Sequence, residues 1–468
     1  MDAEKQDFLG IPSGKDAPTP SSPLETSAGR LADVTLSRKR ALKLMGAGAA
    51  AASLALAGCG SEDQAKGSSS GSGKPSGAST TEATVAKKGS TLEQGPNAGE
   101  VAAAAKRAME KYHLKAVLAK VTRGTEEMAT VAMGESMTGV PATADMHFRN
   151  GAVAISYLGT VLLQLVDEGK VGLDDTIDRW LPKALASDRI TLRMLISCTS
   201  GYQDFVTDKA FNDATDKHPF RAWTSEEQLS YVADKPLLFK PGTNWSYAHT
   251  NFMILGEILA RIGGQPLATL LSENVLGPMG LTGTAESQTS AVPSPVLHAF
   301  TSERREALGI PAGTAFSEES TFWNKQWGTP IGANQTTTID DMATSAVQVG
   351  TGSLLSQSSY HAMTDPNLVG FGSADPSCAP ACRALTDELN FGLGVVRNGS
   401  WLLQTPSLGG YSETMAYLPS QEIAIAVVIT FLPAAYDAQG NNASSALPIY
   451  QSIGALMAPD DPPPTPNG

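Results

Sequence analysis

The sequence predicts an α/β domain of the α+β type, in which an antiparallel sheet is split in the sequence around a helical insert. A helix and a strand open the domain, helices fill its middle, and strands close together in sequence end it. A sheet assembled from the two ends of a chain buries its faces against helices from the same chain. No repeat at solenoid or propeller periods is visible, which excludes those architectures.

Hydrophobic periodicity defines the elements in order. Apolar residues at helical spacing predict an amphipathic helix over 99–113, and a strand follows over 116–122. The segment 152–168 is apolar on nearly every face, so its helix should be buried. The remaining predicted elements are helices over 251–262 and 266–275 and strands over 395–396, 401–404, 413–418 and 423–431.

Composition and charge exclude several classes of function. The 468 residues are 41% hydrophobic and 17% charged, which is typical of a globular chain and not of a disordered or collagen-like one. With 34 Lys and Arg against 47 Asp and Glu, the net charge is −13, and no basic block is interleaved with aromatic residues. Nucleic acid is therefore not an expected partner.

The N-terminal segment has the features of an export signal. A cationic stretch from Ser37 to Lys43 precedes 13 weakly apolar residues, and the small residues Ala57 and Gly58 lead into Cys59. This order resembles a bacterial lipoprotein signal peptide over residues 1–58, with Cys59 lipidated and anchored in the membrane. The basic stretch also resembles a twin-arginine signal. The alternative is a buried Ala-rich helix with an ordinary core cysteine.

Changes in composition divide the rest of the chain. Residues 59–97 are rich in Ser and Gly and predict a flexible tether. Residues 98–457 form the predicted domain, and the Pro-rich residues 458–468 form a tail that is expected to fray. We therefore expect an exported protein that is anchored by lipid to the outer face of the cell membrane.

A series of short stretches in the domain is typical of one enzyme family. They are His147-Phe148-Arg149-Asn150-Gly151 running into 165–175, 190–196 with Thr199-Ser200-Gly201, 239–242 with 245–247, 255–256, 277–281, and 410–412 with 416–419. In this order they resemble the serine β-lactamase and penicillin-binding-protein family, especially its DD-peptidase, class C β-lactamase and esterase branch. The resemblance covers about residues 98–455 and implies a β-lactamase/transpeptidase-like fold, an antiparallel sheet flanked by helices plus a helical subdomain.

That family acylates the serine of a Ser-x-x-Lys motif at the start of the buried helix. A spacing of three is just under one helical turn, so the lysine amine reaches the serine hydroxyl. The matching positions here hold Ala152 and Ile155, and a methyl group cannot attack a carbonyl. No serine from residue 95 onward has a lysine three residues later, so the motif has not moved along the chain.

The other two family motifs are altered as well. Tyr-x-Asn becomes Tyr247-Ala248-His249, so the tyrosine remains while histidine replaces the amide that orients the substrate. Lys/His-x-Gly becomes Gln404-Thr405-Pro406, which removes the group for the substrate carboxylate and one backbone N–H. The acyl-enzyme mechanism that the resemblance implies is therefore not available to these residues.

Three residues remain as fallback catalytic candidates. Ser156 lies four residues after Ala152, about 6 Å along the helix axis, and the alternative for it is a small packing serine. Tyr247 and His249 form the best chemical pair, since a histidine beside a phenol can make the phenol a better base. The alternative is two residues without catalytic role, because no carboxylate or second histidine joins them by sequence spacing.

Cysteines and histidines predict no metal or cofactor site. The six histidines are scattered and form no His/Cys cluster, so we expect neither a metal nor a cofactor. Cys378 and Cys382 enclose three residues and are expected to form a disulfide outside the cytosol. Cys198 follows an apolar run and is expected to be a core residue and not a nucleophile.

Two functions from different classes fit these observations. The first is a catalytically silent envelope lipoprotein whose former cleft binds a cell-wall or protein ligand. The second is a hydrolase, an esterase, amidase or carboxypeptidase, that uses Tyr247, His249 or Ser156 in another mechanism. A purely structural tether differs from the first only in lacking a ligand.

Overall fold

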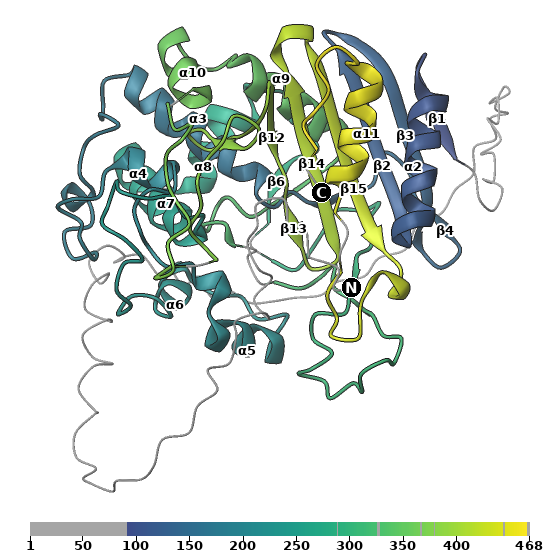
Figure 1. Ribbon diagram of the computed structural model, residues 1–468, viewed down its shortest axis with the longest axis horizontal. Coiled ribbons are helices and arrows are strands. Elements are labelled where there is room, and N and C mark those ends of the chain that lie inside the picture. The colour runs from purple at the N-terminus through teal and green to yellow at the C-terminus, as the bar shows by residue number, and fades with distance from the viewer. Residues whose placement is uncertain are drawn as a thin grey trace, which may run out of the picture. The chain divides into compact units, whose positions relative to one another are not determined.

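The fold is built on a ten-stranded antiparallel sheet whose strands come from both ends of the sequence (Figure 1). The computed structural model describes residues 91–465 apart from 288, 325–327, 366, 379 and 443–444. The main path of the sheet runs β1-β3-β2-β15-β14-β12-β11-β10, with β4 beside β3 and β13 beside β14. Its strands are β1 Leu92–Gln94, β2 Leu114–Arg123, β3 Glu126–Met137, β4 Val140–Pro141, β10 Asn390–Phe391, β11 Val396–Asn398, β12 Trp401–Gln404, β13 Ser407–Leu408, β14 Tyr411–Leu418 and β15 Ile423–Phe431.

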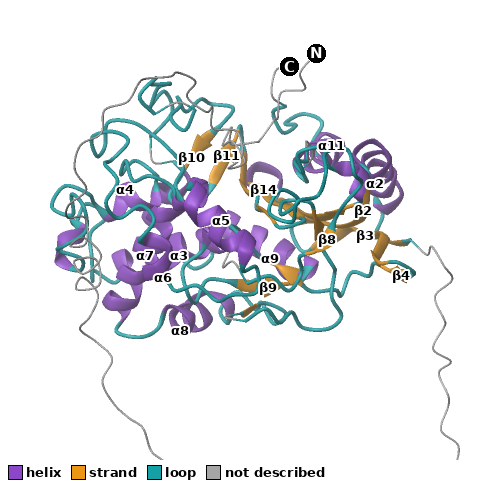
Figure 2. Ribbon diagram, turned by 90° about the horizontal axis from the view of Figure 1, so that it is seen from below, coloured by secondary structure: helices purple, strands orange, loops and turns teal. Residues whose placement is uncertain are grey.

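Helices cover both faces of this sheet. Ser412 of β14 accepts a hydrogen bond from the backbone N–H of Ala446, just before α11 (Leu447–Met457), at 3.0 Å. The ring of Tyr417, on the opposite face of the same strand, lies against Gly350 of α9 (Ile339–Thr351). Figure 2 shows α11 and α2 (Ala98–Tyr112) on one side of the sheet and α9 on the other.

The helical subdomain is organised around α3 (Val153–Asp167), which is buried along most of its length, as its apolar sequence predicts. It packs against α7, α8, α9 and α10. The other elements between β5 and β10 are α4 Leu192–Ile196, α5 Lys209–Lys217, α6 Ser225–Leu229, α7 His249–Gly263, α8 Leu267–Leu271, α10 Gln357–Thr364, the sheet β5 Phe148–Arg149, β9 Gln335–Thr337 and β6 Ala285–Glu286, the pair β7 Phe300–Thr301 and β8 Glu318–Glu319, and the short turns η1 Ile177–Arg179, η2 Phe205–Thr207 and η3 Ser272–Leu276. Two further short turns belong to the end of the chain: η5 Pro419–Gln421 connects β14 to β15, and η6 Pro433–Ala435 follows β15.

The predicted fold class is confirmed, with differences in single elements. β12 and β15 have the predicted bounds, but the long strand β3 was not predicted, because its polar and apolar residues do not alternate cleanly. The helix expected over 266–275 is only five residues of α8, and one π-helical turn, η3, follows it.

The ordered domain extends beyond the expected bounds at both ends. β1, inside the expected tether, pairs with β3 at Leu92 and Ala132. In the Pro-rich tail, the carbonyl of Asp461 accepts the indole N–H of Trp401 at 3.1 Å, and the carbonyl of Pro464 accepts from Gln451 at 2.9 Å. Residues 458–465 are therefore packed on the domain and not frayed. The expected signal peptide and Cys59 lie outside the described residues.

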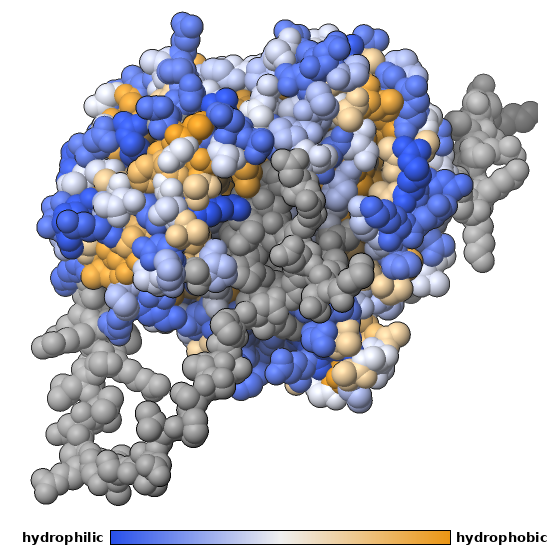
Figure 3. Space-filling view, in the orientation of Figure 1, coloured by the Kyte–Doolittle hydropathy of each residue, from blue (hydrophilic) through white to orange (hydrophobic). Residues whose placement is uncertain are grey.

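None of the helices within the described ranges is both long enough and apolar enough to cross a bilayer. On the coloured part of the face in Figure 3, hydrophilic residues are interspersed with smaller hydrophobic areas.

A carboxyl group is buried in the sheet, on β14. Glu413 of β14 is 1% exposed, and neither carboxyl oxygen has a hydrogen-bond partner in the described part of the chain. Its backbone N–H donates to the carbonyl of Pro406 at 2.9 Å, and the β13–β14 register places Pro406 opposite it. Burial raises the pKa of the Glu413 carboxyl well above its ordinary value, so the group is held neutral.

We predict that Glu413→Gln stabilises the protein at neutral pH. Because the folded state raises the pKa of Glu413, it binds this proton more tightly than the unfolded state, and stability falls as pH rises above the unfolded pKa. Glutamine does not titrate, so the substitution removes this loss of stability at high pH. The free energy of unfolding should therefore rise by about 1 to 3 kcal/mol at pH 7. The difference should vanish near pH 4.

Denaturant unfolding at both pH values measures this difference, with the exposed Glu126→Gln as the matched control. An unchanged or lower stability of Glu413→Gln at pH 7 would contradict the buried neutral carboxyl.

Candidate functional site

The start of α3 is fixed by a sharp turn after β5. Arg149, the last residue of β5, is 1% exposed, and its guanidinium donates to the hydroxyl of Ser287 at 3.1 Å and to the carbonyl of Ser290 at 2.9 Å. Gly151 has φ +49°, in the left-handed region that favours glycine. Ala152 then precedes the first residue of α3 and is half-buried. The position expected for the nucleophile therefore holds a methyl group.

Residues after β12 close over this turn. A Cβ on Gly151 would lie 2.6 Å from Cβ of Pro406 and 2.5 Å from Cδ2 of Leu408. Such distances are shorter than van der Waals contact, so only glycine fits at this position. Pro406, which stands where the third motif has glycine, is thus packed directly against the start of α3.

The side chains of Ile155 and Gln404 are both buried inside the domain. Ile155 is fully buried, and a Cβ on Gly394 would lie 2.8 Å from its carbonyl oxygen. Gln404 is 3% exposed and donates its side-chain N–H to the carbonyl of Gly394 at 2.6 Å. The expected positions of the base and of the anion-binding strand therefore meet at Gly394, and neither brings a charged group there.

Ser156 lies inside the core. Its side chain is 0% exposed, and its hydroxyl donates to the carbonyl of Val153 at 2.6 Å. A hydroxyl that is bonded back to its own helix and shielded from solvent has neither a base nor room for a substrate.

His249 has a carboxylate partner that the sequence spacing did not reveal. Its Nδ1 lies 2.9 Å from Oδ2 of Asp204, and its backbone N–H donates to Oδ1 of the same residue at 3.1 Å. The side chain of Asp204 is 7% exposed and that of His249 is 20% exposed. The two residues thus form a carboxylate–imidazole pair in which the carboxylate is buried and the imidazole reaches the surface.

Tyr247 stands edge-on to this imidazole. The two ring centroids are 4.9 Å apart with an interplanar angle of 86°, and the tyrosine ring also contacts Phe252 and Phe391. Behind the imidazole, Gly328 approaches so closely that a Cβ there would lie 2.2 Å from Cδ2 of His249. The structure therefore brings Tyr247, His249 and Asp204 together in one cluster.

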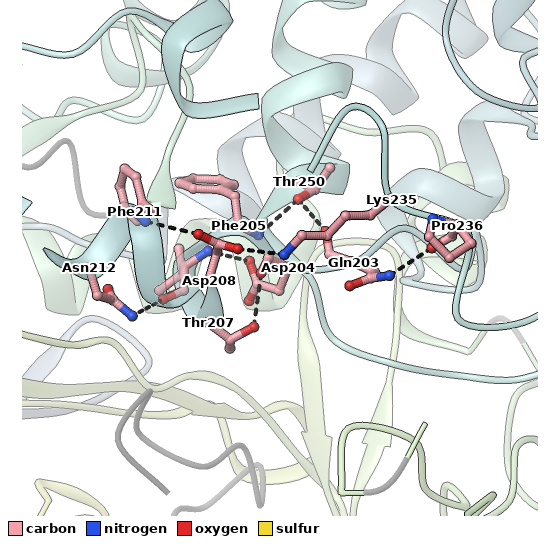
Figure 4. A network of polar contacts seen from close by, with 11 residues as sticks. Gln203, Asp204, Phe205, Thr207, Asp208, Phe211, Asn212, Lys235, Pro236 and Thr250 are labelled. Carbon is pink, nitrogen blue, oxygen red and sulfur yellow. Dashed lines mark hydrogen bonds and ion pairs between the residues drawn. The ribbon is translucent and has the colours of Figure 1, made fainter. Parts of the chain in front are cut away.

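The loop that carries Asp204 is tied to the start of α7 (Figure 4). The hydroxyl of Thr250 donates to the carbonyl of Gln203 at 2.6 Å and accepts the N–H of Phe205 at 3.3 Å. Further along the loop, Asp208 accepts the N–H of Phe211 at 2.9 Å and binds the amine of Lys235 at 2.5 Å. These bonds on both sides hold the Asp204 carboxylate against His249.

The cysteines occupy structural positions. Cys378 and Cys382 are joined in a disulfide with an S–S distance of 2.03 Å. Cys198 is fully buried, and burial raises the pKa of its thiol to about 12, so it is not a thiolate at neutral pH. Within the part of the chain that the structure describes, no group of three or more His, Cys, Asp and Glu side chains could hold a metal ion.

These features place the protein in a family. The fold, the turn into α3 and the altered motifs around it define a domain of the serine β-lactamase and penicillin-binding-protein type. The chain belongs to the beta-lactamase family, whose model, described as Beta-lactamase, matches residues 101–447. The predicted resemblance is thereby confirmed.

Curated relatives match parts of the chain. Esterase EstB of Burkholderia gladioli is 30% identical over 203 residues, which are 40% of this chain and 52% of the esterase. Penicillin-binding protein 4 of Amycolatopsis lactamdurans is 33% identical over 150 residues, 31% of this chain and 37% of that protein. The chain therefore spans about half the length of the first of these relatives and less of the second.

Solved structures show the same fold at lower identity. A D-stereospecific amidohydrolase from Streptomyces sp. aligns with a TM-score of 0.61 and 20% identity over 76% of this chain and 98% of its own. D-amino acid amidase from Ochrobactrum anthropi SV3, complexed with D-phenylalanine, aligns with a TM-score of 0.62 and 19% identity over 77% of this chain and 99% of its own. At these identities the likeness supports the fold alone.

We predict that the double substitution Ala152→Ser and Ile155→Lys restores labelling by a fluorophosphonate at residue 152. The helix start would again hold a hydroxyl and an amine one turn apart. Turnover of a β-lactam should stay absent or weak, because Gln404 and Pro406 still offer no group for the substrate carboxylate. Lysine in the fully buried site of Ile155 should cost about 2 to 4 kcal/mol of stability.

Peptide mass mapping after labelling gives the readout, and Ala152→Ser alone serves as the control that lacks a base. A folded double variant that never labels at residue 152 would show that this position is not where the nucleophile of the family acts.

Proposed function

We propose that this chain is a catalytically silent member of the family that acts by binding, anchored at the outer face of the cell membrane. One observation carries the proposal: the expected nucleophile and base positions hold Ala152 and Ile155, and Ile155 is fully buried. Neither side chain can attack a carbonyl or accept a proton. The ligand we expect is a cell-wall fragment or a protein.

The surroundings of these two positions support the same proposal. Gln404 donates its amide N–H to the carbonyl of Gly394. Pro406 packs on Gly151 and stands where the family has a glycine that lets a substrate approach. An enzyme that had lost only its nucleophile would be expected to keep this side of the site open. Here the nucleophile and base positions and the strand that would bind the substrate are all altered together, as expected for a chain that does not form an acyl-enzyme.

The proposed anchor is Cys59, at the end of the segment that resembles a lipoprotein signal peptide. We predict that wild type partitions into the detergent phase and that Cys59→Ala partitions into the aqueous phase, because the lipid on Cys59 would be the anchor. Phase separation of membranes from cells that express each form measures this. Equal membrane association of both forms would refute the anchor.

A second candidate function is hydrolysis through the Asp204–His249 pair. A buried carboxylate that holds an imidazole is the arrangement of a general base, and relatives of this chain are named esterase and D-aminopeptidase. The imidazole could activate a water molecule for attack on an ester or amide. The pair also has a structural role, since Asp204 accepts the backbone N–H groups of His249 and Val206.

We predict that the purified chain forms no adduct with a fluorescent penicillin or a fluorophosphonate and does not hydrolyse a chromogenic cephalosporin, p-nitrophenyl butyrate or D-phenylalanine amide. Intact-mass analysis and product release measure the two parts. A single stoichiometric adduct in the wild-type protein would contradict the proposal.

Turnover without an adduct would favour the second candidate, and substitutions then test it. His249→Ala should reduce the rate by about 10²-fold or more, as expected for loss of a general base. The exposed His361→Ala is the matched control and should retain the rate. Turnover that survives His249→Ala would exclude the Asp204–His249 pair as its source.

A further inference from the structure

A hairpin that we call the strap lies between α10 and β10. It runs over residues 370–385, of which the structure describes all but 379. Its two arms pair through the backbone, since Gly370 donates to the carbonyl of Leu385 and Leu385 donates to that of Phe371, both at 2.8 Å. The strap is therefore a local unit whose two ends are held together at its base.

The tip of the strap is closed by the Cys378–Cys382 disulfide. Cys378 donates its backbone N–H to the carbonyl of Asp375 at 3.0 Å, and Cys382 donates to the carbonyl of Cys378 at 3.2 Å. Both half-cystines are buried. The disulfide thus links the turn at the tip to Cys382, where the returning arm begins.

Both arms of the strap are attached to the segment 244–246. On the outgoing arm, Asn244 donates from Nδ2 to the carbonyl of Ser373 at 3.2 Å, and its Oδ1 accepts the backbone N–H of Ser373 at 2.9 Å. On the returning arm, Cys382 forms an antiparallel β-bridge with Ser246. The half-cystine that closes the tip is therefore also a residue that holds the strap on this segment.

The strap fits closely on the segment 244–246. Gly372 has φ +82°, and a Cβ there would lie 2.4 Å from the carbonyl oxygen of Arg383 and 3.1 Å from Oδ1 of Asn244. Only glycine allows the two arms and Asn244 to approach one another this closely. The guanidinium of Arg383 also lies over the ring of Trp245, 5.0 Å from its centroid.

This segment leads directly into the candidate site. Tyr247 follows Ser246 in the chain, and the rings of Trp245 and Tyr247 both contact Phe391 of β10, with centroid distances of 5.7 and 6.1 Å. Tyr247 in turn stands edge-on to His249. The position of Tyr247 therefore depends on the segment that the strap holds and on the strand that follows the strap.

We propose that the strap is a redox-dependent latch for the Tyr247–His249–Asp204 cluster, closed by the Cys378–Cys382 disulfide. With the disulfide formed, the tip holds Cys382 against Ser246, and Tyr247 is fixed beside His249. With two thiols instead, the tip gains conformational freedom, the bridge to Ser246 weakens and the cluster loses its fixed geometry.

The redox step is a thiol–disulfide exchange. Opening requires a dithiol as reductant: the S–S bond of the strap breaks, two thiols form there, and the dithiol becomes a disulfide. Closing is the reverse exchange with a disulfide as oxidant. Since thiols persist in the cytosol and disulfides form outside it, the latch would leave the cluster unformed until the chain has been exported.

This regulatory role rests on the proposed location outside the cytosol, whereas the coupling between the disulfide and the cluster is a property of the fold. The coupling can be measured without a ligand or an activity. Its failure is therefore distinguishable from failure of the proposed function.

Hydrogen–deuterium exchange of the full chain tests the coupling in three forms: oxidised wild type, wild type reduced with dithiothreitol, and the double variant Cys378→Ala and Cys382→Ala. We expect the amides of residues 244–249 to exchange at least tenfold faster in the second and third forms, because the strap no longer holds this segment. Exchange in β15 should stay within twofold. Nitration of Tyr247 by tetranitromethane should be at least threefold faster in the double variant, while the buried Tyr450 stays unmodified.

Two single substitutions separate the strap from the disulfide. Gly372→Ala keeps both cysteines and disturbs the close approach of the arms to Asn244, so it should also speed exchange over 244–249 with the disulfide intact. Ala384→Ser, at an exposed position on the returning arm, is the matched control and should exchange as wild type does.

Two results would overturn the proposal. The first is unchanged exchange over 244–249 in the folded reduced protein, which would show that the disulfide does not hold the cluster. The second is equal acceleration in β15, or loss of the fold in the reduced wild type, which would show that the disulfide stabilises the whole domain. The reduced wild type decides between these results even if the double variant does not fold.

Discussion

The close approach of the β12–β13 segment to the start of α3 is the constraint on which the rest of the site depends. Pro406 and Leu408 lie so near Gly151 that a single Cβ would not fit there. On the next turn of α3, the carbonyl of Ile155 approaches Gly394, whose own carbonyl is bound by Gln404. Packing of this kind stabilises the junction of sheet and helical subdomain, and it uses the positions that an acyl-enzyme mechanism needs for chemistry.

The cluster around His249 differs from the start of α3, because it contains ionisable side chains. Asp204 and His249 form a carboxylate–imidazole pair, and Tyr247 stands edge-on to the imidazole. The loop of Asp204 is held by hydrogen bonds on both sides. Asp204 also accepts hydrogen bonds from two backbone N–H groups, so it stabilises the loop whether or not the pair acts in catalysis. A geometry suited to general-base chemistry can therefore persist where stability is the only demand, and only kinetics separates the two roles.

The sequence was sufficient for the parts of the structure that depend on local pattern. The apolar run of α3, the bounds of β12 and β15 and the altered residues Ala152 and Ile155 could all be read directly, since each depends on residue type and spacing. The partner of His249 could not, because Asp204 lies 45 positions away and meets it only through the packing of its loop on α7. The same limit applies to the carboxyl of Glu413, because its burial follows from tertiary packing and leaves no signal in the sequence.

We infer that no side chain near the start of α3 forms an acyl-enzyme. A crystal structure of the full chain determined after prolonged exposure to benzylpenicillin tests it most directly. We expect Ala152 to be unmodified, Pro406 to remain packed on Gly151, and Gln404 to remain hydrogen-bonded to the carbonyl of Gly394. Electron density for an acyl group continuous with a side chain at the start of α3 would contradict this.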